Sequence, residues 1–492
     1  MKLKTVEIKN FRCFESLSID FDEQLTVFVG ENGAGKTTIL DAIAVAISPF
    51  VGGFDTGISK GFKPEDARLV SDFKLTDDNS FLIELSPRYS TMEPQYSISL
   101  MATGIINGQF EPWSRELTGA KTQTTFGKAK VLIDYAKTLQ QQVREREPVT
   151  LPIVAYYGTG RLLKQSNTSK KSSTESRSRL YGYHDALNPN ADYKSFEKWF
   201  IETSIAEYIN ESKARIAEYI NESKARNELY RATQELLQKE GILSANDSFG
   251  LPVEASYNPV ERPFPSQTKY VQQAVNKCLS ISKWHSLEYE PNLRTLILSN
   301  ENKTFMPVPL LSDGVKAMLT LIADIAYRCV QLNPHLASPC EETNGIVLID
   351  EIDLHLHAKW QQTVLSDLQK AFPCIQFIVT THSPQVLSTV PSHQIRILLD
   401  ERQIYLAEAG TQGAESSRIL KRIFGVDPRP QHDPNTQLLN EYLDLVYADK
   451  WNEAKEQREK LDAIYQGNEP ALTEADLYIE NRQWELNLEE NQ

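Results

Sequence analysis

The chain has 492 residues, of which 40% are hydrophobic and 24% are charged, with a net charge of −14 at pH 7. This length allows two or three domains of ordinary soluble composition, and the acidic balance argues against a basic protein that coats nucleic acid. Because the chain has neither a run of about 18 uncharged apolar residues nor the apolar core of a signal peptide, we expect no membrane contact and a cytoplasmic location. Its five scattered cysteines are never spaced C-x-x-C, which argues against a disulfide framework or a zinc site.

The N-terminal third is predicted to be rich in strands. Alternating or apolar residues predict strands at 3–8, 17–21 and 25–29, and a glycine-rich turn and a helix at 36–47 follow the last of them. Residues 80–112 have the pattern of a β-meander with strands at 81–85, 95–101 and 109–113 and a hairpin turn at Asn107-Gly108. A helix at 129–146 and a buried strand at 151–157 follow.

The middle of the chain contains an identical repeat, I-A-E-Y-I-N-E-S-K-A-R, at 205–215 and 216–226. Eleven residues at about 100° each make three helical turns with only about 20° left over. The repeat therefore lengthens a helix, predicted at 195–240, without rotating its Ile/Tyr face, and we interpret it as structurally neutral. Before this helix, residues 164–179 are basic and rich in Ser and Thr, which predicts a mobile loop, with nucleic-acid contact as the alternative interpretation.

The second half of the chain alternates helices and strands. A helix at 268–279 and strands at 286–289 and 293–298 precede a helix at 314–331, a strand at 346–349, a helix at 358–371 and strands at 375–379 and 394–399. From about 411 onward the pattern is helical, and residues 449–492 hold twelve acidic against five basic residues. This acidic end is a poor candidate for contacting phosphates and a fair one for contacting a protein.

The turn after the third strand carries a complete phosphate-loop motif, Gly30-Glu-Asn-Gly-Ala-Gly-Lys-Thr37. Its glycines let several backbone N–H groups point at phosphate oxygens, and the N-terminus of the following helix adds partial positive charge. Lys36 is expected to reach the β- and γ-phosphates, and the Thr37 hydroxyl to bind Mg²⁺. We therefore predict ATP and Mg²⁺ as cofactors, with nucleotide contacts from Asn32, Gly33, Gly35, Lys36, Thr37 and Thr38.

An acidic pair, Asp350 and Glu351, ends the apolar segment at 345–349. We expect Asp350 to hold Mg²⁺ together with Thr37, and Glu351 to act as the general base that polarises the attacking water. The alternative is a strand that merely ends in a polar turn. Two adjacent carboxylates after four β-forming residues make that alternative hard to sustain.

A histidine follows the next strand, in the segment Thr381-His-Ser-Pro384. His382 can hydrogen-bond both the γ-phosphate and the water, and we predict a catalytic role for it. A lone histidine is more often a core residue, but this one lies one strand beyond the acidic pair. Two other histidines, His355 and His357, could chelate zinc with nearby aspartates, which we regard as a minor alternative.

The segment Leu311-Ser-Asp-Gly-Val-Lys316 opens the helix predicted at 314–331. In isolation Ser312 would be an ordinary N-cap. Its place roughly 35 residues before the acidic pair favours a signature motif in which Ser312 and Gly314 contact nucleotide. Asp313 stands where such motifs usually have glycine, and a carboxylate near the γ-phosphate is repulsive, so binding of ATP is a firmer prediction than its hydrolysis.

The order of these motifs resembles that of the ABC ATPase superfamily. Within it, the chain resembles the RecF/SMC/OLD branch at Ile8-Lys-Asn-Phe-Arg-Cys-Phe14, at the phosphate loop, and at Asp350-Glu-Ile-Asp-Leu-His-Leu-His357. The resemblance implies an α/β fold: a split ABC-type P-loop ATPase head with a mixed sheet, flanking helices and an antiparallel β subdomain. We expect its lobes at 1–160 and 305–410, a helical insertion at 161–304 and a helical acidic C-terminal extension at 411–492.

In that branch the signature serine of one subunit completes the ATP site of another. The resemblance therefore implies a head-to-head homodimer that encloses two nucleotides. By the same analogy Arg12 approaches the phosphates, and residues 350–357 form a D-loop that contacts the partner subunit. A Q-loop glutamine cannot be assigned, and Asp66-Ala-Arg68 is a candidate region only.

Over most of its length the chain resembles the PtuA family, the ATPase subunits of Septu-type bacterial anti-phage systems and of certain retrons. The head motifs, Tyr156-Tyr-Gly-Thr-Gly-Arg161 and the segment at 417–430 carry this resemblance. It implies an ATP-driven switch subunit that regulates a partner HNH endonuclease and, in the retron version, a reverse transcriptase with its multicopy DNA–RNA. We expect no nuclease activity from the chain itself, because residues 411–492 lack the D-x-D cluster of a Toprim domain. The alternative is a RecF-like repair ATPase that acts directly on DNA.

Overall fold

The computed structural model describes residues 1–71, 92–162, 178–189, 194–239, 266–279, 281, 284–302, 304–399 and 402–490. The chain packs as two units, Met1–Gly413 and Ala414–Gln492. The strand predicted at 81–85 and most of the loop predicted at 164–179 lie outside the described residues.

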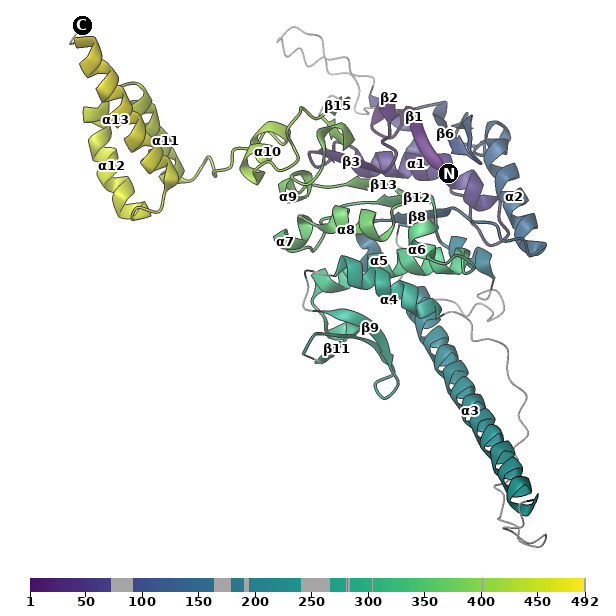
Figure 1. Cartoon of the computed structure of the whole chain (residues 1–492). Coiled ribbons are helices and arrows are strands. Elements are labelled where there is room, and N and C mark those ends of the chain that lie inside the picture. The colour runs from purple at the N-terminus through teal and green to yellow at the C-terminus, as the bar shows by residue number, and fades with distance from the viewer. Residues whose placement is uncertain are drawn as a thin grey trace. The chain divides into compact units, whose positions relative to one another are not determined.

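A six-stranded sheet forms the centre of the first unit (Figure 1). Its order is β15-β14-β3-β13-β12-β8, and every neighbouring pair is parallel except β14 with β15. The strands are β3 (Leu25–Gly30), β8 (Ile153–Tyr157), β12 (Gly345–Ile349), β13 (Ile375–Thr380), β14 (Ile395–Leu398) and β15 (Ile404–Leu406). All residues of β3, β8, β12 and β13 are buried, as expected for parallel strands that are covered on both faces.

Helix α1 (Lys36–Gly52) lies between this sheet and a second one. It contacts β3, β12 and β13 on one side and strands of a four-stranded antiparallel sheet, order β2-β1-β6-β7, on the other. These strands are β1 (Lys2–Phe11), β2 (Phe14–Asp20), β6 (Ile98–Ile106) and β7 (Gln109–Leu117). Every residue of α1 from Ala42 to Val51 is buried, because a helix between two sheets must be apolar all round. Helix α2 (Lys130–Arg144) packs against α1.

Other helices cover the opposite face of the six-stranded sheet (Figure 1). They are α4 (Gln267–Cys278), α5 (Asp313–Leu332), α6 (Pro339–Glu342) and α8 (Val364–Ala371). The single helix predicted at 358–371 is wrong: α7 (Ala358–Gln361) ends before α8 begins. The side chain of Gln361 explains the break, because its amide donates to the Leu356 carbonyl (2.9 Å) and accepts from the Ser383 hydroxyl (2.8 Å), which ties this turn to the neighbouring loops.

Two small antiparallel sheets complete the first unit. One has the order β11-β10-β9, with β9 (His285–Glu290), β10 (Thr295–Ser299) and β11 (Phe305–Pro307). The other pairs β4 (Arg68–Ser71) with β5 (Met92–Gln95). The sequence did not predict β4, β5, β11 or β15, all of which are too short to show a clear hydrophobic period.

Helix α3 (Lys194–Lys239) is continuous over 46 residues and contains both copies of the repeat, as predicted. Its first turns are anchored by the buried side chains of Phe196 and Phe200. Further along, the Glu207 carboxylate accepts hydrogen bonds from the N-terminal residues of α4, including the Ser266 hydroxyl (3.0 Å). The apolar face of the repeat is exposed at Ile205, Tyr208, Ile209, Ile216 and Tyr219.

The second unit is helical, as predicted for the C-terminal extension. It consists of α10 (Ser416–Ile423), α11 (Pro434–Tyr447), α12 (Trp451–Tyr465) and α13 (Pro470–Glu490). The last three helices share a core of seven buried residues, namely Leu439, Tyr442, Val446, Ala454, Leu461, Leu472 and Ala475. Arg458 on α12 pairs with Asp476 on α13 (2.8 Å), which adds a charge-assisted contact beside that core.

These elements confirm the predicted α/β fold class. The P-loop head has a mixed sheet, built from strands at both ends of the first unit, and an antiparallel subdomain; a helical C-terminal extension follows. The finer division at 160, 304 and 410 stays a prediction. In the part of the chain that the structure describes, no helix is long and apolar enough to cross a membrane.

Candidate nucleotide site

Three strands of the main sheet end side by side at one edge. Strand β13 lies between β3 and β12, with Thr380 paired to Phe28 and Val379 paired to Ile349. The loops that follow these strands therefore converge. Thr37, after β3, contacts Asp350, after β12, although 313 residues separate them in the chain. The carboxyl edge of a parallel sheet is the usual place for a ligand site.

The phosphate loop is held in shape by two left-handed glycines. Gly33 has φ 85° and Gly35 has φ 109°, values that side-chain-bearing residues rarely adopt. A Cβ on Gly35 would lie 2.7 Å from the Phe14 ring and 2.8 Å from the Cys13 sulfur. The end of the Ile8–Phe14 motif therefore supports the loop directly, and any larger residue at Gly35 would push the loop away from it.

Lys36 is the first residue of α1, and its side chain crosses the loop. Its ammonium donates to the Gly30 carbonyl (2.9 Å) and to the Glu31 carbonyl (2.8 Å). Burial lowers the pKa of Lys36, while the carboxylates of Asp350, Glu351 and Asp353 oppose that effect. The loop thus holds a cation at the acidic edge of the sheet.

Thr37 and Asp350 join the two halves of the split head. The Thr37 hydroxyl donates to one carboxylate oxygen of Asp350 (2.8 Å), and the Thr380 hydroxyl donates to the other (2.6 Å). Asp350 is buried, and its backbone N–H donates to the Tyr157 carbonyl of β8 (2.8 Å). A carboxylate held on both oxygens and through its backbone has a fixed orientation toward the start of α1.

The chain turns sharply at Glu351, which has a φ of 47°. Its backbone N–H donates to the same Thr380 hydroxyl (2.8 Å). A non-glycine residue in the left-handed region is strained, and such strain persists where the surrounding structure enforces it. Asp350 is buried and accepts from Thr37, whereas Glu351 is half-buried.

His382 lies at the end of β13, on the same edge. Burial and the positive charge of Lys36 lower the pKa of His382 below its ordinary value of 6.5, against the opposing effect of Asp353, Glu351 and Asp350. The imidazole is therefore neutral at pH 7. Only a neutral ring can donate one hydrogen bond and accept another, as contact with both a phosphate and a water requires.

This state of His382 predicts a pH dependence. Because the pKa is lowered, the neutral form extends below pH 6.5, and ATP turnover should stay level from pH 8 to pH 6.5 and fall at more acid pH as the ring is protonated. His382→Asn should lower turnover roughly tenfold to a hundredfold, the loss of one hydrogen bond to a charged group. A pH profile of both chains tests this; an acid limb that persists unchanged in His382→Asn would contradict the assignment.

Arg12 lies beside the site in an ion-pair network that the sequence did not predict. Its guanidinium donates to Asp41 of α1 (2.7 Å) and to Asp66 (2.8 Å), and Asp41 also accepts from Lys60 (2.7 Å). Although burial acts to lower the pKa of Arg12, the pairs with Asp41 and Asp66 raise it. The structure thus places Arg12 between two carboxylates, and it makes Asp66, named as a Q-loop candidate, a partner of Arg12.

Ser312 is the exposed residue at the N-cap position of α5, and its hydroxyl makes no capping hydrogen bond. The alternative interpretation of Ser312 as an ordinary N-cap is therefore not supported. Gly314 packs on the D-loop, since a Cβ there would lie 2.7 Å from the His355 carbonyl oxygen. The side chains of Lys36 and Thr37 hydrogen-bond to Gly30, Glu31 and Asp350, and none of these three bonds involves Ser312.

The sequence analysis did not predict two further contacts at the carboxyl edge of the six-stranded sheet. The Thr381 hydroxyl donates to Asp353 (2.6 Å), which fastens the D-loop to the end of β13. The Tyr157 hydroxyl, at the end of β8, donates to the buried Asp324 of α5 (2.7 Å), and Arg328 donates to the same oxygen (2.7 Å). Helix α5, which begins with the Ser312 segment, is thereby linked to the strand that holds Asp350.

The donor set suits Mg²⁺ and a nucleotide phosphate. Thr37 and Asp350 offer hard oxygen ligands from adjacent positions, while the described residues include no group of three His, Cys, Asp or Glu side chains that could hold a metal unaided. A site with two protein oxygens matches Mg²⁺, which keeps several waters and takes the rest of its shell from phosphate. The buried Lys36 ammonium and the α1 N-terminus supply positive charge for the same phosphate.

Comparison with known proteins gives the same assignment. Residues 1–387 match the family described as AAA ATPase domain. The chain is 30% identical to a protein named Retron Ec83 probable ATPase from Escherichia coli, over 100% of this chain and 89% of that protein. It is 23% identical to Septu protein PtuA of Bacillus thuringiensis over 86% and 84% of the two chains. Among solved structures, the SMC head domain from Thermotoga maritima matches with a TM-score of 0.39 and 14% identity, covering 83% of this chain and 100% of that one. The chain therefore belongs to the AAA ATPase domain family, and over its full length it is related to a protein named as a probable retron ATPase.

Proposed function

We propose that this chain binds and hydrolyses ATP as a dimeric switch. The observation that carries the proposal is the contact between Thr37 and Asp350, which joins the phosphate loop to the acidic strand end across the split head. When bound, Mg²⁺ would be held by Thr37 and Asp350 and would neutralise charge on the transferred phosphoryl group.

The other steps, which are phosphate binding, proton transfer and orientation of the water, are assigned to residues of this chain. Lys36 and the N–H groups of the glycine-rich loop, with Asn32 and Thr38 at its flanks, hold and orient the phosphates. Glu351 accepts a proton from the attacking water, and neutral His382 orients that water by hydrogen bonding. Arg12 follows the last residue of β1 and is held by Asp41 and Asp66; from there it would approach the phosphates.

We infer that the site is completed by Ser312 and Gly314 of a second copy in a head-to-head dimer. Two observations support this: the Ser312 hydroxyl makes no capping hydrogen bond, and the residue is exposed at a helix N-terminus. A helix N-terminus with an available hydroxyl is suited to contact a phosphate. Asp313 beside it is exposed, and its repulsion of phosphate is consistent with slow turnover.

A mixing experiment tests the shared site. Lys36→Ala and Ser312→Arg should each be inactive alone, whereas a mixture contains dimers in which one site keeps both Lys36 and Ser312. Random pairing should restore about a quarter of the wild-type turnover, because half of the dimers are mixed and each has one intact site. A mixture as inactive as its components would rule out the proposed arrangement, and a Ser312→Arg chain with full activity would do the same.

We further propose that the switch serves anti-phage defence and acts on a partner HNH endonuclease, in a retron together with a reverse transcriptase and its DNA–RNA. The names of the retron and Septu relatives support the defence role. The second unit supports a protein partner: Leu477 and Trp484 are 55% and 67% exposed and lie seven residues apart on one face of α13. An acidic unit with an exposed apolar stripe suits a partner with a basic rim.

Co-purification tests this partner. A tagged chain expressed with its neighbouring genes should retain an HNH protein, and Trp484→Ala should weaken that complex roughly tenfold or more, as loss of an interface anchor does. Tyr405→Ala is the matched control, since Tyr405 is an exposed aromatic residue of β15 in the first unit. If no nuclease co-elutes and DNA alone stimulates turnover, the chain is instead a repair ATPase that acts directly on DNA.

A further inference from the structure

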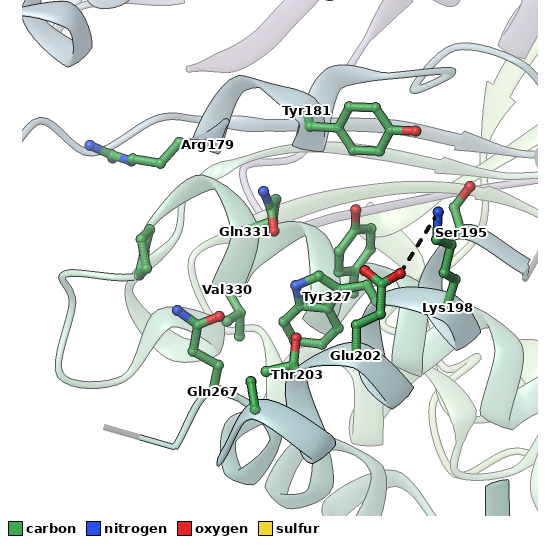
Figure 2. Close-up of a pocket in the computed structure, with 13 residues that line it drawn as sticks. Arg179, Tyr181, Ser195, Lys198, Glu202, Thr203, Gln267, Tyr327, Val330 and Gln331 are labelled. Carbon is green, nitrogen blue, oxygen red and sulfur yellow. Dashed lines mark ion pairs between the residues drawn. The ribbon is translucent and has the colours of Figure 1, made fainter. Parts of the chain in front are cut away.

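A cavity of about 680 Å³ lies at the base of α3, apart from the nucleotide site. Its walls come from α3, α5, the start of α4 and the short helix η5 (Arg179–Tyr183), as Figure 2 shows. The volume is within the range of small-molecule sites, roughly 300–1,000 Å³. The residues that characterise it are Tyr181, Lys198, Trp199, Glu202, Gln267 and Tyr327.

Aromatic rings form one part of the lining. Trp199 of α3 and Tyr327 of α5 are in contact, with ring centroids 4.9 Å apart and planes inclined by 51°. Tyr181 lines the cavity from η5 and is backed by His184, which stacks on it at 4.8 Å and 12°. Rings that are fixed by their neighbours provide flat surfaces for a planar ligand at little entropic cost.

Polar groups form the other part. Lys198 and Glu202, one turn apart on α3, make an ion pair at 3.8 Å that Figure 2 marks at the edge of the cavity. Both side chains are more than half exposed, so each can exchange its partner for a ligand group. The amide of Gln267 adds a donor and an acceptor.

A flat ring with hydrogen-bonding edges and a negative charge matches this lining. Aromatic side chains stack on nucleobases, amides and carboxylates read their edges, and a lysine pairs with the phosphate. We propose that this cavity binds a nucleotide unit, either a free mononucleotide or a nucleotide of a single strand, and that its occupancy alters ATP turnover. The second half of the proposal rests on the proposed ATPase function; the first does not.

A continuous set of contacts leads from the cavity to the ATP site. The Arg328 guanidinium donates to the carbonyls of Gly182 (2.8 Å) and His184 (3.1 Å), which lie at the C-terminal end of η5, just after Tyr181. Arg328 also pairs with Asp324, which accepts from Tyr157. The Tyr157 carbonyl in turn accepts from the backbone N–H of Asp350. A ligand that moves η5 or α5 would therefore act on the strand end that carries the acidic pair.

Binding is tested in the full chain carrying Lys36→Ala, so that the phosphate loop does not take up the probe. A fluorescein-labelled twelve-nucleotide DNA strand of mixed sequence should raise fluorescence anisotropy on titration, and Trp199→Leu should weaken its binding at least fivefold, as loss of one stacking partner does. Lys198→Glu, a change at an exposed position, should weaken binding and reduce its salt dependence. Tyr208→Ala, an exposed aromatic residue on the same helix outside the cavity, should leave binding unchanged.

Competition identifies the source of the nucleotide. Displacement of the probe by free AMP indicates a mononucleotide site, and displacement only by unlabelled strands indicates nucleic acid. No binding of either, or equal binding by the parent chain, Trp199→Leu and Lys198→Glu, overturns the proposal. In the chain with Lys36 intact, the strand should change ATP turnover, and Trp199→Leu should lose that response; binding without any change of turnover overturns the regulatory half alone.

Discussion

Lys36→Ala should lower the affinity for ATP roughly a hundredfold or more, the usual scale for removing a charged donor from a buried anion site. The ammonium is buried and lies across the loop, within hydrogen-bond distance of the Gly30 and Glu31 carbonyls. Its removal takes away the positive charge closest to the acidic edge formed by Asp350 and Glu351. Titration with a fluorescent ATP analogue measures the effect.

Lys128→Ala is the matched control for that experiment, because the Lys128 side chain is 70% exposed and pairs with Glu116 of β7. Its affinity for ATP should equal that of the unchanged protein. Thermal unfolding without nucleotide should be similar for both variants. If Lys36→Ala bound ATP as tightly as Lys128→Ala, the phosphate-loop assignment would be wrong.

Glu351→Gln should reduce ATP turnover roughly 10²- to 10⁴-fold, the contribution of a positioned general base. The amide keeps the shape of the carboxylate but accepts no proton, so ATP affinity should be retained. The backbone contact of Glu351 with Thr380 does not depend on the side chain, so the turn after β12 is preserved. Single-turnover hydrolysis and equilibrium binding separate the two effects.

Because the variant binds ATP without consuming it, it should also accumulate the ATP-bound dimer, which light scattering detects. Glu408→Gln, at an exposed position beyond β15, provides the control and should retain full turnover. Unchanged turnover in Glu351→Gln would refute its role as the base. A variant that neither binds ATP nor dimerises would point to a structural role instead.

The sequence predicted the parts of the site whose chemistry dictates a local pattern. The phosphate loop needs left-handed glycines next to a lysine at the start of a helix, and Gly33, Gly35 and Lys36 follow one another within four positions. The acidic pair needs a buried strand before it, and β12 is buried throughout. In both cases the motif and the hydrophobic pattern of the adjoining strand or helix lie in one short stretch of sequence, so both could be recognised.

Contacts between distant segments had no such pattern. Arg12 meets Asp41 and Asp66 at sequence separations of 29 and 54 residues, and nothing in those stretches marks the pairing. Thr380, which holds both Asp350 and the Glu351 backbone, lies one residue beyond the strand predicted at 375–379 and was given no role. The break between α7 and α8 was missed because Gln361 bonds to residues on two other segments, which override local helix propensity.

The packing of Gly314 against the His355 carbonyl has a consequence for the kinetics of a dimer. In the proposed arrangement, Ser312 and Gly314 of one subunit face the nucleotide of the other subunit, while His355 follows the acidic pair of its own site. Binding or hydrolysis of one nucleotide would then affect the other site, because the Ser312–Gly314 segment and the segment around His355 are in contact within one chain. Such a molecule should show cooperative binding of ATP, with a sigmoidal dependence of turnover on ATP concentration.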